Sequence, residues 1–492
     1  MTLQEGGNCS SASPLVDWDQ PYTPYRNNAE KVLKLRIDID GHTTTAASIN
    51  TRNEQIQEIV EILCPFLGNP NNDSNGDCDP PTPRRCFEIK PLTGGLSNHL
   101  FLISNDAKNV LVRIHPDDDD DDERKNGNET ANANANENGN GTVGFSFVDR
   151  ESEPKFAAWL ASHKNKLAPT VYGRFLNGRV EEFYASVRPL SCVEMKFYAP
   201  WIAQRMAAFH ALEAPPLDVL PRPAKAATVY ETVASWLSEA QATGHENESE
   251  RIGNDEFLRD LSTEWAWLEK ELTSPPQQTA AKCQKANDDN DRSIAAEALE
   301  FIRRVAVTHM DCQPLNILID VENNDNHGGN EEAVGAVDVA RGSNRLRLID
   351  YEYAGWNPVA ADIANTFCEY CEMTNLCADF DNEYPTPVQQ NVFLWNYLMH
   401  LDPLRAKRFS SYPSRHPESN NNDQTAAEDK EWDIFSATLQ QEIGRFSLLS
   451  HLGWAIWSVV KAREEDCVDF DYMAYARHRM EGYAWAKKRF IV

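Results

Sequence analysis

The stretch VAVTHMDCQPLNILID, residues 305–320, places three polar residues in a bend between two apolar runs. The apolar residues before and after the bend predict two short buried strands. Polar groups between buried strands are costly unless each has a partner or a task. The pattern His309-x-Asp311-x-x-x-x-Asn316 therefore indicates a functional loop.

A second acid follows in LRLIDYEYAGWNP, residues 346–358, where Asp350 ends another apolar run. Phosphoryl transfer needs a group that orients and deprotonates the attacking hydroxyl, and oxygen ligands for Mg²⁺ beside the nucleotide phosphates. Asp311 suits the first task, and Asn316 and Asp350 suit the second. We expect His309 to brace the loop. Any one of these residues alone would be interpreted as a cap or turn, but the combination predicts a kinase-like site.

The composition bounds the class of protein. The 492 residues suggest about two to four units of ordinary domain size. A net charge of −29 argues against nucleic-acid or anionic-membrane partners, which need a basic surface. The N-terminal residues lack a secretory pattern, and no apolar run is long enough to span a membrane, so we expect a cytoplasmic protein with free thiols. Cys368-x-x-Cys371 lacks the second pair of a zinc site and is interpreted as ordinary helix cysteines.

The pattern of apolar residues predicts an α+β fold of two lobes. Residues 86–184 contain five strand-like segments and a helix near 150–163, whereas residues 194–213 and most of the chain from 228 onward have helical patterns. We therefore expect an N-terminal extension over 1–84 with a helix and a disordered stretch, a nucleotide-binding lobe with a small antiparallel sheet over 85–185, and a helical lobe over 186–492. Five polar stretches hold too little apolar surface to offset the entropy of ordering and are expected to be loop insertions: 69–83, 117–141, 275–292, 321–344 and 413–430.

The first lobe offers candidate phosphate contacts. In TGGLSN, residues 93–98, Gly94 and Gly95 would let the backbone approach a phosphate, and Ser97 and Asn98 could donate to it, although a plain Gly-Gly hairpin turn fits equally well. Arg113 ends the apolar run NVLVRI and needs a negative partner. We expect a nucleotide phosphate together with Glu153 on the following helix, or else Glu151. The chain has no G-x-x-x-x-G-K-[ST] motif, so a P-loop is excluded.

From about residue 86 to 489 the sequence resembles the choline/ethanolamine kinase family, which has a protein-kinase-like fold. The resemblance rests on TGGLSNHLF, VLVRI, THMDCQPLNILI, LIDYEYAGWNPVAADIANTFCEY and HLGWAIW. It implies that Asp311 is the catalytic base and that Asn316 and Asp350 bind Mg²⁺. It further implies nucleotide contacts from Gly94, Gly95, Ser97, Asn98, Arg113, Glu153, Glu182 and Tyr184, and a cationic alcohol enclosed by Tyr353, Glu369, Trp454, Trp457 and Tyr475.

Two tryptophans have a physical interpretation of their own. Trp454 and Trp457 share one face of a long helix, where such a pair is ordinarily core. A trimethylammonium group has no N–H donor and can be held only by ring faces and by carboxylate charge. Two departures bear on the substrate. Thr374 stands where the choline-kinase branch often has an aromatic residue, whereas Cys368 before Glu369 resembles that branch.

We therefore expect ATP- and Mg²⁺-dependent phosphorylation of choline or ethanolamine, the first step toward phosphatidylcholine or phosphatidylethanolamine, with ATP between the lobes. The resemblance also implies a homodimer. Two alternatives remain open: an aminoglycoside-type phosphotransferase of the same fold, and a catalytically dead nucleotide-binding module. The first would need several carboxylates in place of rings, and the second conflicts with intact Asp311, Asn316, Asp350 and Arg113.

Overall fold

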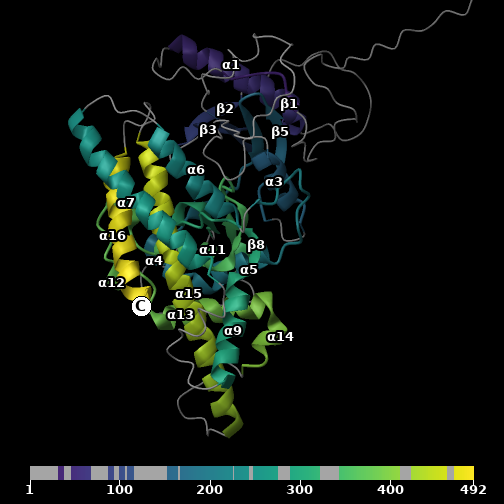
Figure 1. Ribbon diagram of the computed structural model, residues 1–492. Coiled ribbons are helices and arrows are strands. Elements are labelled where there is room, and N and C mark those ends of the chain that lie inside the picture. The colour runs from purple at the N-terminus through teal and green to yellow at the C-terminus, as the bar shows by residue number, and fades with distance from the viewer. Residues whose placement is uncertain are drawn as a thin grey trace, which may run out of the picture. The chain divides into compact units, whose positions relative to one another are not determined.

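The computed structural model describes residues 32–37, 46–67, 87–92, 99–105, 108–115, 152–163, 167–224, 227–242, 248–274, 289–321, 343–409, 423–462 and 470–491 (Figure 1). These residues form two compact units, one from the described residues up to 185 and one from residue 186 onward.

The first unit is built on a six-stranded sheet with the order β1-β5-β6-β4-β3-β2. All five strands expected in 86–184 are present, and only the pairing of β1 with β5 is parallel. The sheet is therefore mixed rather than purely antiparallel as predicted. Its elements are β1 (Val32–Leu33), α1 (Ala46–Leu63), β2 (Glu88–Leu92), β3 (His99–Ser104), β4 (Asn109–Ile114), α3 (Ser152–Ala161), β5 (Val171–Phe175) and β6 (Gly178–Glu182).

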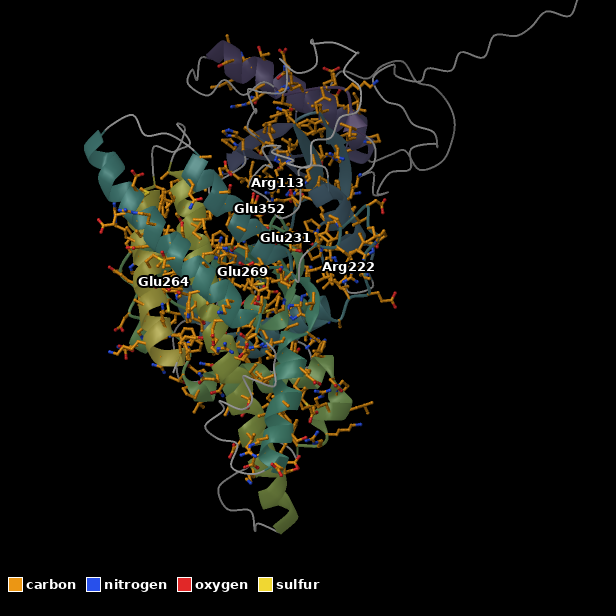
Figure 2. The ribbon with its side chains drawn as sticks, viewed as in Figure 1. Arg113, Arg222, Glu231, Glu264, Glu269 and Glu352 are labelled. Carbon is orange, nitrogen blue, oxygen red and sulfur yellow. The ribbon has the colours of Figure 1, made fainter. Side chains whose placement is uncertain are left out.

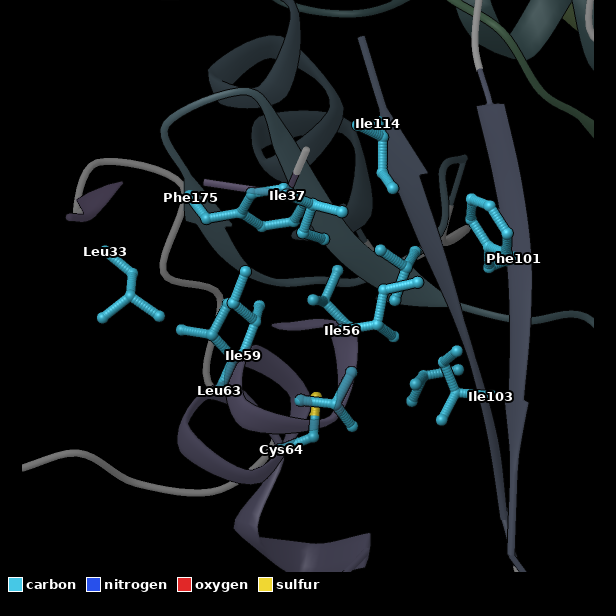
Figure 3. Packing of buried hydrophobic residues seen from close by; sticks show 14 of the residues in the cluster. Leu33, Ile37, Ile56, Ile59, Leu63, Cys64, Phe101, Ile103, Ile114 and Phe175 are labelled. Carbon is cyan, nitrogen blue, oxygen red and sulfur yellow. The ribbon is translucent and has the colours of Figure 1, made fainter. Parts of the chain in front are cut away.

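The core of this unit joins the sheet to the segment that was expected to be a separate extension. Figure 3 shows Ile56, Ile59 and Leu63 of α1 packed with Phe101 and Ile103 of the sheet. All five side chains are buried, so removing α1 would expose one apolar face of the sheet to water. The described part of residues 32–67 thus belongs to the first unit.

One glycine decides how closely two strands of the sheet approach. Gly178 begins β6 opposite Ile114, and a side chain at this position would collide with the carbonyl oxygen of Arg113 and the ring of Phe175. Glycine is therefore needed here because the neighbouring backbone lies within the space of a Cβ atom.

The second unit is mainly helical, with two small sheets of order β10-β9-β7 and β11-β8. The 39-residue helix α15 packs against α16, α11, α9 and α6 and forms the centre of the unit. Its elements are β7 (Val187–Pro189), α4 (Cys192–Phe197), α5 (Ala199–His210), α6 (Thr228–Ala242), α7 (Glu248–Leu272), α9 (Asp289–Arg303), β8 (Val305–Thr308), β9 (Ile317–Asp320), β10 (Leu346–Leu348), β11 (Gly355–Pro358), α11 (Val359–Cys368), α12 (Phe380–Glu383), α13 (Pro387–Leu401), α14 (Pro403–Ala406), α15 (Asp423–Lys461) and α16 (Tyr472–Phe490).

The expected insertions fall largely outside the described residues. That holds for all of 69–83 and 117–141 and for most of 275–292, 321–344 and 413–430. Two of these ranges were drawn too wide, because α9 begins at Asp289 and α15 at Asp423. In the part of the chain that the structure describes, no helix is both long enough and apolar enough to cross a bilayer.

Candidate active site

The bend at residues 309–316 lies between β8 and β9, and His309 connects it to the residue that follows β10. The His309 ring is fully buried, and its Nε2 lies 3.0 Å from the carbonyl oxygen of Ile349. Its Nδ1 accepts from the backbone N–H of Asp311 at 3.2 Å. Because a carbonyl can only accept, the proton is on Nε2, and burial lowers the pKa of the ring so that it stays neutral. The contacts fit a bracing residue, as expected.

Asp362 holds the backbone of the same loop. Its carboxylate accepts from the N–H groups of His309 at 2.9 Å and of Met310 at 2.8 Å. Met310 has a φ of 65°, which is unfavourable for a residue with a side chain, and the two hydrogen bonds fix it there. Sequence analysis missed Asp362, although an acid in the apolar run VAADIANTF was a signal, since a buried acid needs donors.

Asp311 and Asn316 are in direct contact. The Asn316 Nδ2 donates to the Asp311 backbone oxygen at 3.0 Å and to its Oδ2 at 2.7 Å. These bonds orient the amide and leave its Oδ1 to serve as an acceptor or a metal ligand.

Asp350 is brought to the same place by strand pairing. Leu348 pairs with Ile317, and the N–H of Ile349 donates to the carbonyl oxygen of Asn316 at 3.1 Å. Asp350 itself has a φ of 66°. Among the described residues no cluster of three or more His, Cys, Asp or Glu could form a metal site. One carboxylate and one amide oxygen still suit Mg²⁺, which usually keeps several waters and binds phosphate oxygens.

The pKa of Asp311 is raised well above its ordinary value. Burial is the main cause, and the negative charges of Glu369 and Asp350 add to it. The three acids therefore share one electrostatic environment. Glu369 forms a buried salt bridge with Arg479, whose Nη2 lies 2.5 Å from its Oε1, and the Arg479 Nε donates to the Tyr475 hydroxyl at 2.8 Å. Sequence analysis did not single out Arg479.

Three of the predicted rings form a continuous aromatic wall. The ring centroids of Tyr353 and Trp454 are 5.0 Å apart, and those of Trp454 and Trp457 are 5.3 Å apart. The Trp454 Nε1 donates to Asn365 Oδ1 at 2.8 Å, which fixes the orientation of this half-buried ring. Trp454 and Met310 of the 309–316 loop line the same small cavity, so the aromatic wall and the loop are neighbours. Trp236, which also contacts Trp454, was missed by sequence analysis.

The charged cluster of the first unit differs from the prediction in its pairing. Arg113 on β4, labelled in Figure 2, has its Nε 3.4 Å from Glu181 Oε1. Glu153, the expected partner, forms its salt bridge with Arg179 at 2.7 Å, although the charge of Arg113 also lowers the Glu153 pKa. The prediction failed because Arg179 and Glu181, two residues apart on β6, lie on the same face of the sheet as Arg113 on the neighbouring β4. The pattern within one strand does not reveal which residues a neighbouring strand places beside it.

Of the other residues predicted to contact the nucleotide, only Glu182 and Tyr184 belong to the described part of the chain. Glu182 ends β6, where its N–H donates to the Thr170 carbonyl at 2.8 Å, and Tyr184 follows just before the passage into the second unit. Gly94, Gly95, Ser97, Asn98 and Glu151 lie outside the described residues. Cys368 and Cys371 are buried, and burial raises the pKa of both thiols, which agrees with core cysteines.

A unit built on a sheet, a His-x-Asp loop beside the strand-end Asp350, and a helical unit that carries Glu369 and an aromatic wall are the features of a small-molecule phosphotransferase of the kinase type. A family model described as choline/ethanolamine kinase matches residues 143–484. The chain belongs to the choline/ethanolamine kinase family, and the protein is a kinase.

Individual relatives agree with this assignment. The chain is 26% identical to a probable choline kinase 2 of Arabidopsis thaliana over 83% of its length and 87% of the relative. The fold matches the crystal structure of a choline kinase from Cryptosporidium parvum with a TM-score of 0.55 at 20% identity, covering 89% of this chain and 96% of the other. An ethanolamine kinase from Plasmodium vivax gives a TM-score of 0.54 at 17% identity, with 91% and 92% coverage. These likenesses support the protein-kinase-like fold expected from the sequence.

Proposed function

We propose that the protein transfers the γ-phosphate of ATP to the hydroxyl of choline or ethanolamine, with Asp311 as the group that orients and deprotonates this hydroxyl. The observation that carries the proposal is the contact of Asp311 with Asn316 at 2.7 Å next to a wall of aromatic rings and the acid Glu369. The loop proposed to position the hydroxyl lies next to ring faces and a carboxylate, which are the groups that can hold a quaternary or primary ammonium.

Asn316 and Asp350 are the proposed Mg²⁺ ligands. The metal would neutralise charge on the phosphates, and the side chains would hold it beside Asp311. In the first unit we assign phosphate contacts to Arg113 with the segment 93–98, and adenine contacts to the backbone at Glu182 and Tyr184. These roles follow from the family resemblance together with the positions of Arg113, Glu182 and Tyr184 on or just after the strands of the sheet.

The raised pKa of Asp311 has a consequence for the order of events. A base must be ionised, yet burial and the charges of Glu369 and Asp350 favour its protonated form. A magnesium ion at Asp350 and an ammonium group at Glu369 would each offset that repulsion. The bound substrates themselves would thus bring Asp311 into its reactive state, so that the base is ionised when the hydroxyl is in place.

Release of ADP in the presence of MgATP, measured separately with choline and with ethanolamine, tests the proposal. Asp311→Asn is expected to reduce kcat on the order of 100-fold to 10,000-fold, the usual range for a lost general base, while ATP binding is retained. Asp320→Asn is the matched control, because this half-exposed acid at the end of β9 pairs with Arg347 and lies outside the site. Absence of turnover with both alcohols, in wild-type protein that binds MgATP, would favour a nucleotide-binding module instead.

The ratio of kcat/KM for choline to kcat/KM for ethanolamine in the wild-type protein shows which of the two alcohols is preferred. Thr374, at the position where the choline branch often carries a ring, is exposed and donates to Glu372 at 3.3 Å. We also propose that the enzyme is cytoplasmic and, on the family resemblance, that it forms a homodimer. Light scattering of the purified protein tests the dimer.

A further inference from the structure

A chain of buried hydrogen bonds reaches the catalytic loop from the side of the unit formed by α9 and α13. Arg304, directly after α9, donates from Nη2 to the hydroxyl of Tyr397 on α13 at 2.8 Å. That hydroxyl lies 2.8 Å from Nδ1 of His210, the last residue of α5. The His210 Nε2 lies 2.9 Å from Asp362 Oδ2 on α11. Asp362 in turn holds the backbone N–H groups of His309 and Met310.

The direction of every donor in this chain is fixed by its two ends. An arginine can only donate and an ionised carboxylate can only accept. The His210 Nε2 therefore carries the proton that Asp362 accepts, and the Nδ1 of His210 must accept from the Tyr397 hydroxyl. The Tyr397 oxygen is then free to accept from Arg304. A single tautomer of His210 satisfies all four groups at once.

Burial makes this arrangement rigid. Tyr397 is 0% exposed, Asp362 1% and His210 5%. Burial lowers the pKa of His210 despite the adjacent carboxylate, and the hydrogen bond from His210 helps to lower the pKa of Asp362 against the opposing effect of burial. The ring is thus neutral and the acid ionised, as the donor directions require. Because Tyr397, His210 and Asp362 are buried, a lost donor leaves a buried group unsatisfied.

We infer that His210, Tyr397 and Arg304 are positioning residues for phosphoryl transfer: they hold Asp362 so that it fixes Met310 in its left-handed conformation and thereby aims Asp311. None of the three is proposed to touch a substrate. The hydrogen-bonded chain from Arg304 through Tyr397 and His210 to Asp362, called the relay below, depends on the proposed function only for its kinetic measurement. Its direct physical consequence, protection of the His309 and Met310 amides from exchange, is independent of activity.

The test compares two conservative hydroxyl deletions in the full-length protein. Tyr397→Phe removes the middle of the relay. Tyr370→Phe is the matched control, because the Tyr370 hydroxyl is also buried but has no hydrogen-bond partner among the described residues. Tyr397→Phe is expected to lower kcat by about threefold to tenfold, the range for one buried hydrogen bond expressed in the transition state, with both KM values unchanged. Tyr370→Phe is expected to leave kcat and both KM values unchanged.

A second pair of variants tests His210 itself. His210→Leu removes the donor to an ionised carboxylate, and we expect a loss in kcat on the order of 30-fold to 100-fold. His210→Gln keeps an N–H that can reach Asp362, and part of the lost kcat is expected to return. If His210→Leu does not fold, the tyrosine pair decides the matter.

Amide hydrogen exchange of peptides covering 305–312, measured without substrates, completes the experiment. The relay predicts faster exchange at His309 and Met310 in Tyr397→Phe and unchanged exchange in Tyr370→Phe. Equal exchange and equal kcat in the two tyrosine variants would overturn the inference. Inactive wild-type protein would instead reject the proposed function, and the exchange data would still judge the relay.

Discussion

Replacement of Glu153 by glutamine gives the sharpest quantitative prediction for the first unit. Glu153 on α3 is buried, and its Oε1 accepts from Arg179 Nη2 at 2.7 Å. Arg179 also donates from Nε to Glu181 at 2.7 Å, and Glu181 lies beside Arg113. The substitution keeps the shape of the side chain and removes its charge, so that two buried arginines share one carboxylate.

The magnitude follows from the pKa of Glu153. Burial by itself would raise this pKa, but the charge and hydrogen bond of Arg179, with help from Arg113 and His115, lower it from 4.5 to about 2. Each pKa unit corresponds to about 1.36 kcal/mol, so the ionised carboxylate contributes about 3 kcal/mol to folding at neutral pH. Since the folded-state pKa is depressed, this contribution is complete above pH 4.5 and is lost as the pH falls through about 2.

Urea titrations at pH 7 and pH 3, read by hydrogen exchange of peptides from β4 and β6, measure this free energy for the first unit. Glu153→Gln should be destabilised by about 3 kcal/mol at pH 7 and by only about 1 kcal/mol at pH 3. Glu88→Gln on β2 is the control, because its salt bridge with Lys90 is exposed and worth less than about 1 kcal/mol. A loss for Glu153→Gln that is the same at both pH values would refute the electrostatic reasoning and indicate a packing defect.

Three further predictions concern the second unit. Trp454→Ala and Trp457→Ala should each raise the KM for choline more than the KM for ethanolamine, by a factor of about 2 to 30 for one lost cation–π contact. Trp432→Phe on the same helix is the control. An equal effect on both alcohols would place the ring in the core. Because the pKa of Asp311 is raised, kcat/KM should increase as the pH rises through that pKa. For the same reason Asp311→Asn should be more stable than wild type at neutral pH, and the difference should vanish once the pH is low enough to protonate the carboxyl in the unfolded state. A variant that is less stable than wild type in thermal melts at neutral pH would contradict this. Glu442→Gln should destabilise the helical unit by about 3 kcal/mol in urea titrations, because the buried Glu442 pairs with the half-buried Arg303 at 2.7 Å and with the buried Arg445 at 2.8 Å. Glu297→Gln should cost less than about 1 kcal/mol, because the pairs of Glu297 with Arg405 and Arg408 are partly exposed.

The candidate site divides into residues that local pattern could find and residues that it could not. Asp311, Asn316 and Asp350 stand at the ends of apolar runs, so a polar group with a task is visible from its immediate neighbours. Asp362 had such a local signal, an acid within an apolar run, but His210 and Arg479 lie in helices where a polar residue on a helical face is ordinary. The importance of His210 and Arg479 depends on what packs against that face, and the acid that pairs with each lies more than 100 residues away in the chain.

The same distinction explains the corrections to the fold. The five strands of 86–184 were expected because alternation is a property of each strand, but β1 has two residues and is recognised only by its pairing with β5. Likewise, the extension 1–84 was expected to contain a helix, and helix α1 belongs to the first unit because Ile56, Ile59 and Leu63 pack on the apolar face of the sheet.

The sequence by itself determined the order of the lobes, the chemistry of the His-x-Asp loop and the family, because these depend on residue types at short, fixed spacings. Only the tertiary structure decided which charges pair, which rings touch and what holds the loop in its unusual conformation. The reason is physical: burial and hydrogen-bond direction act between side chains that are close in space, and the free energy of a charge is set by its neighbours there, whatever their distance along the chain.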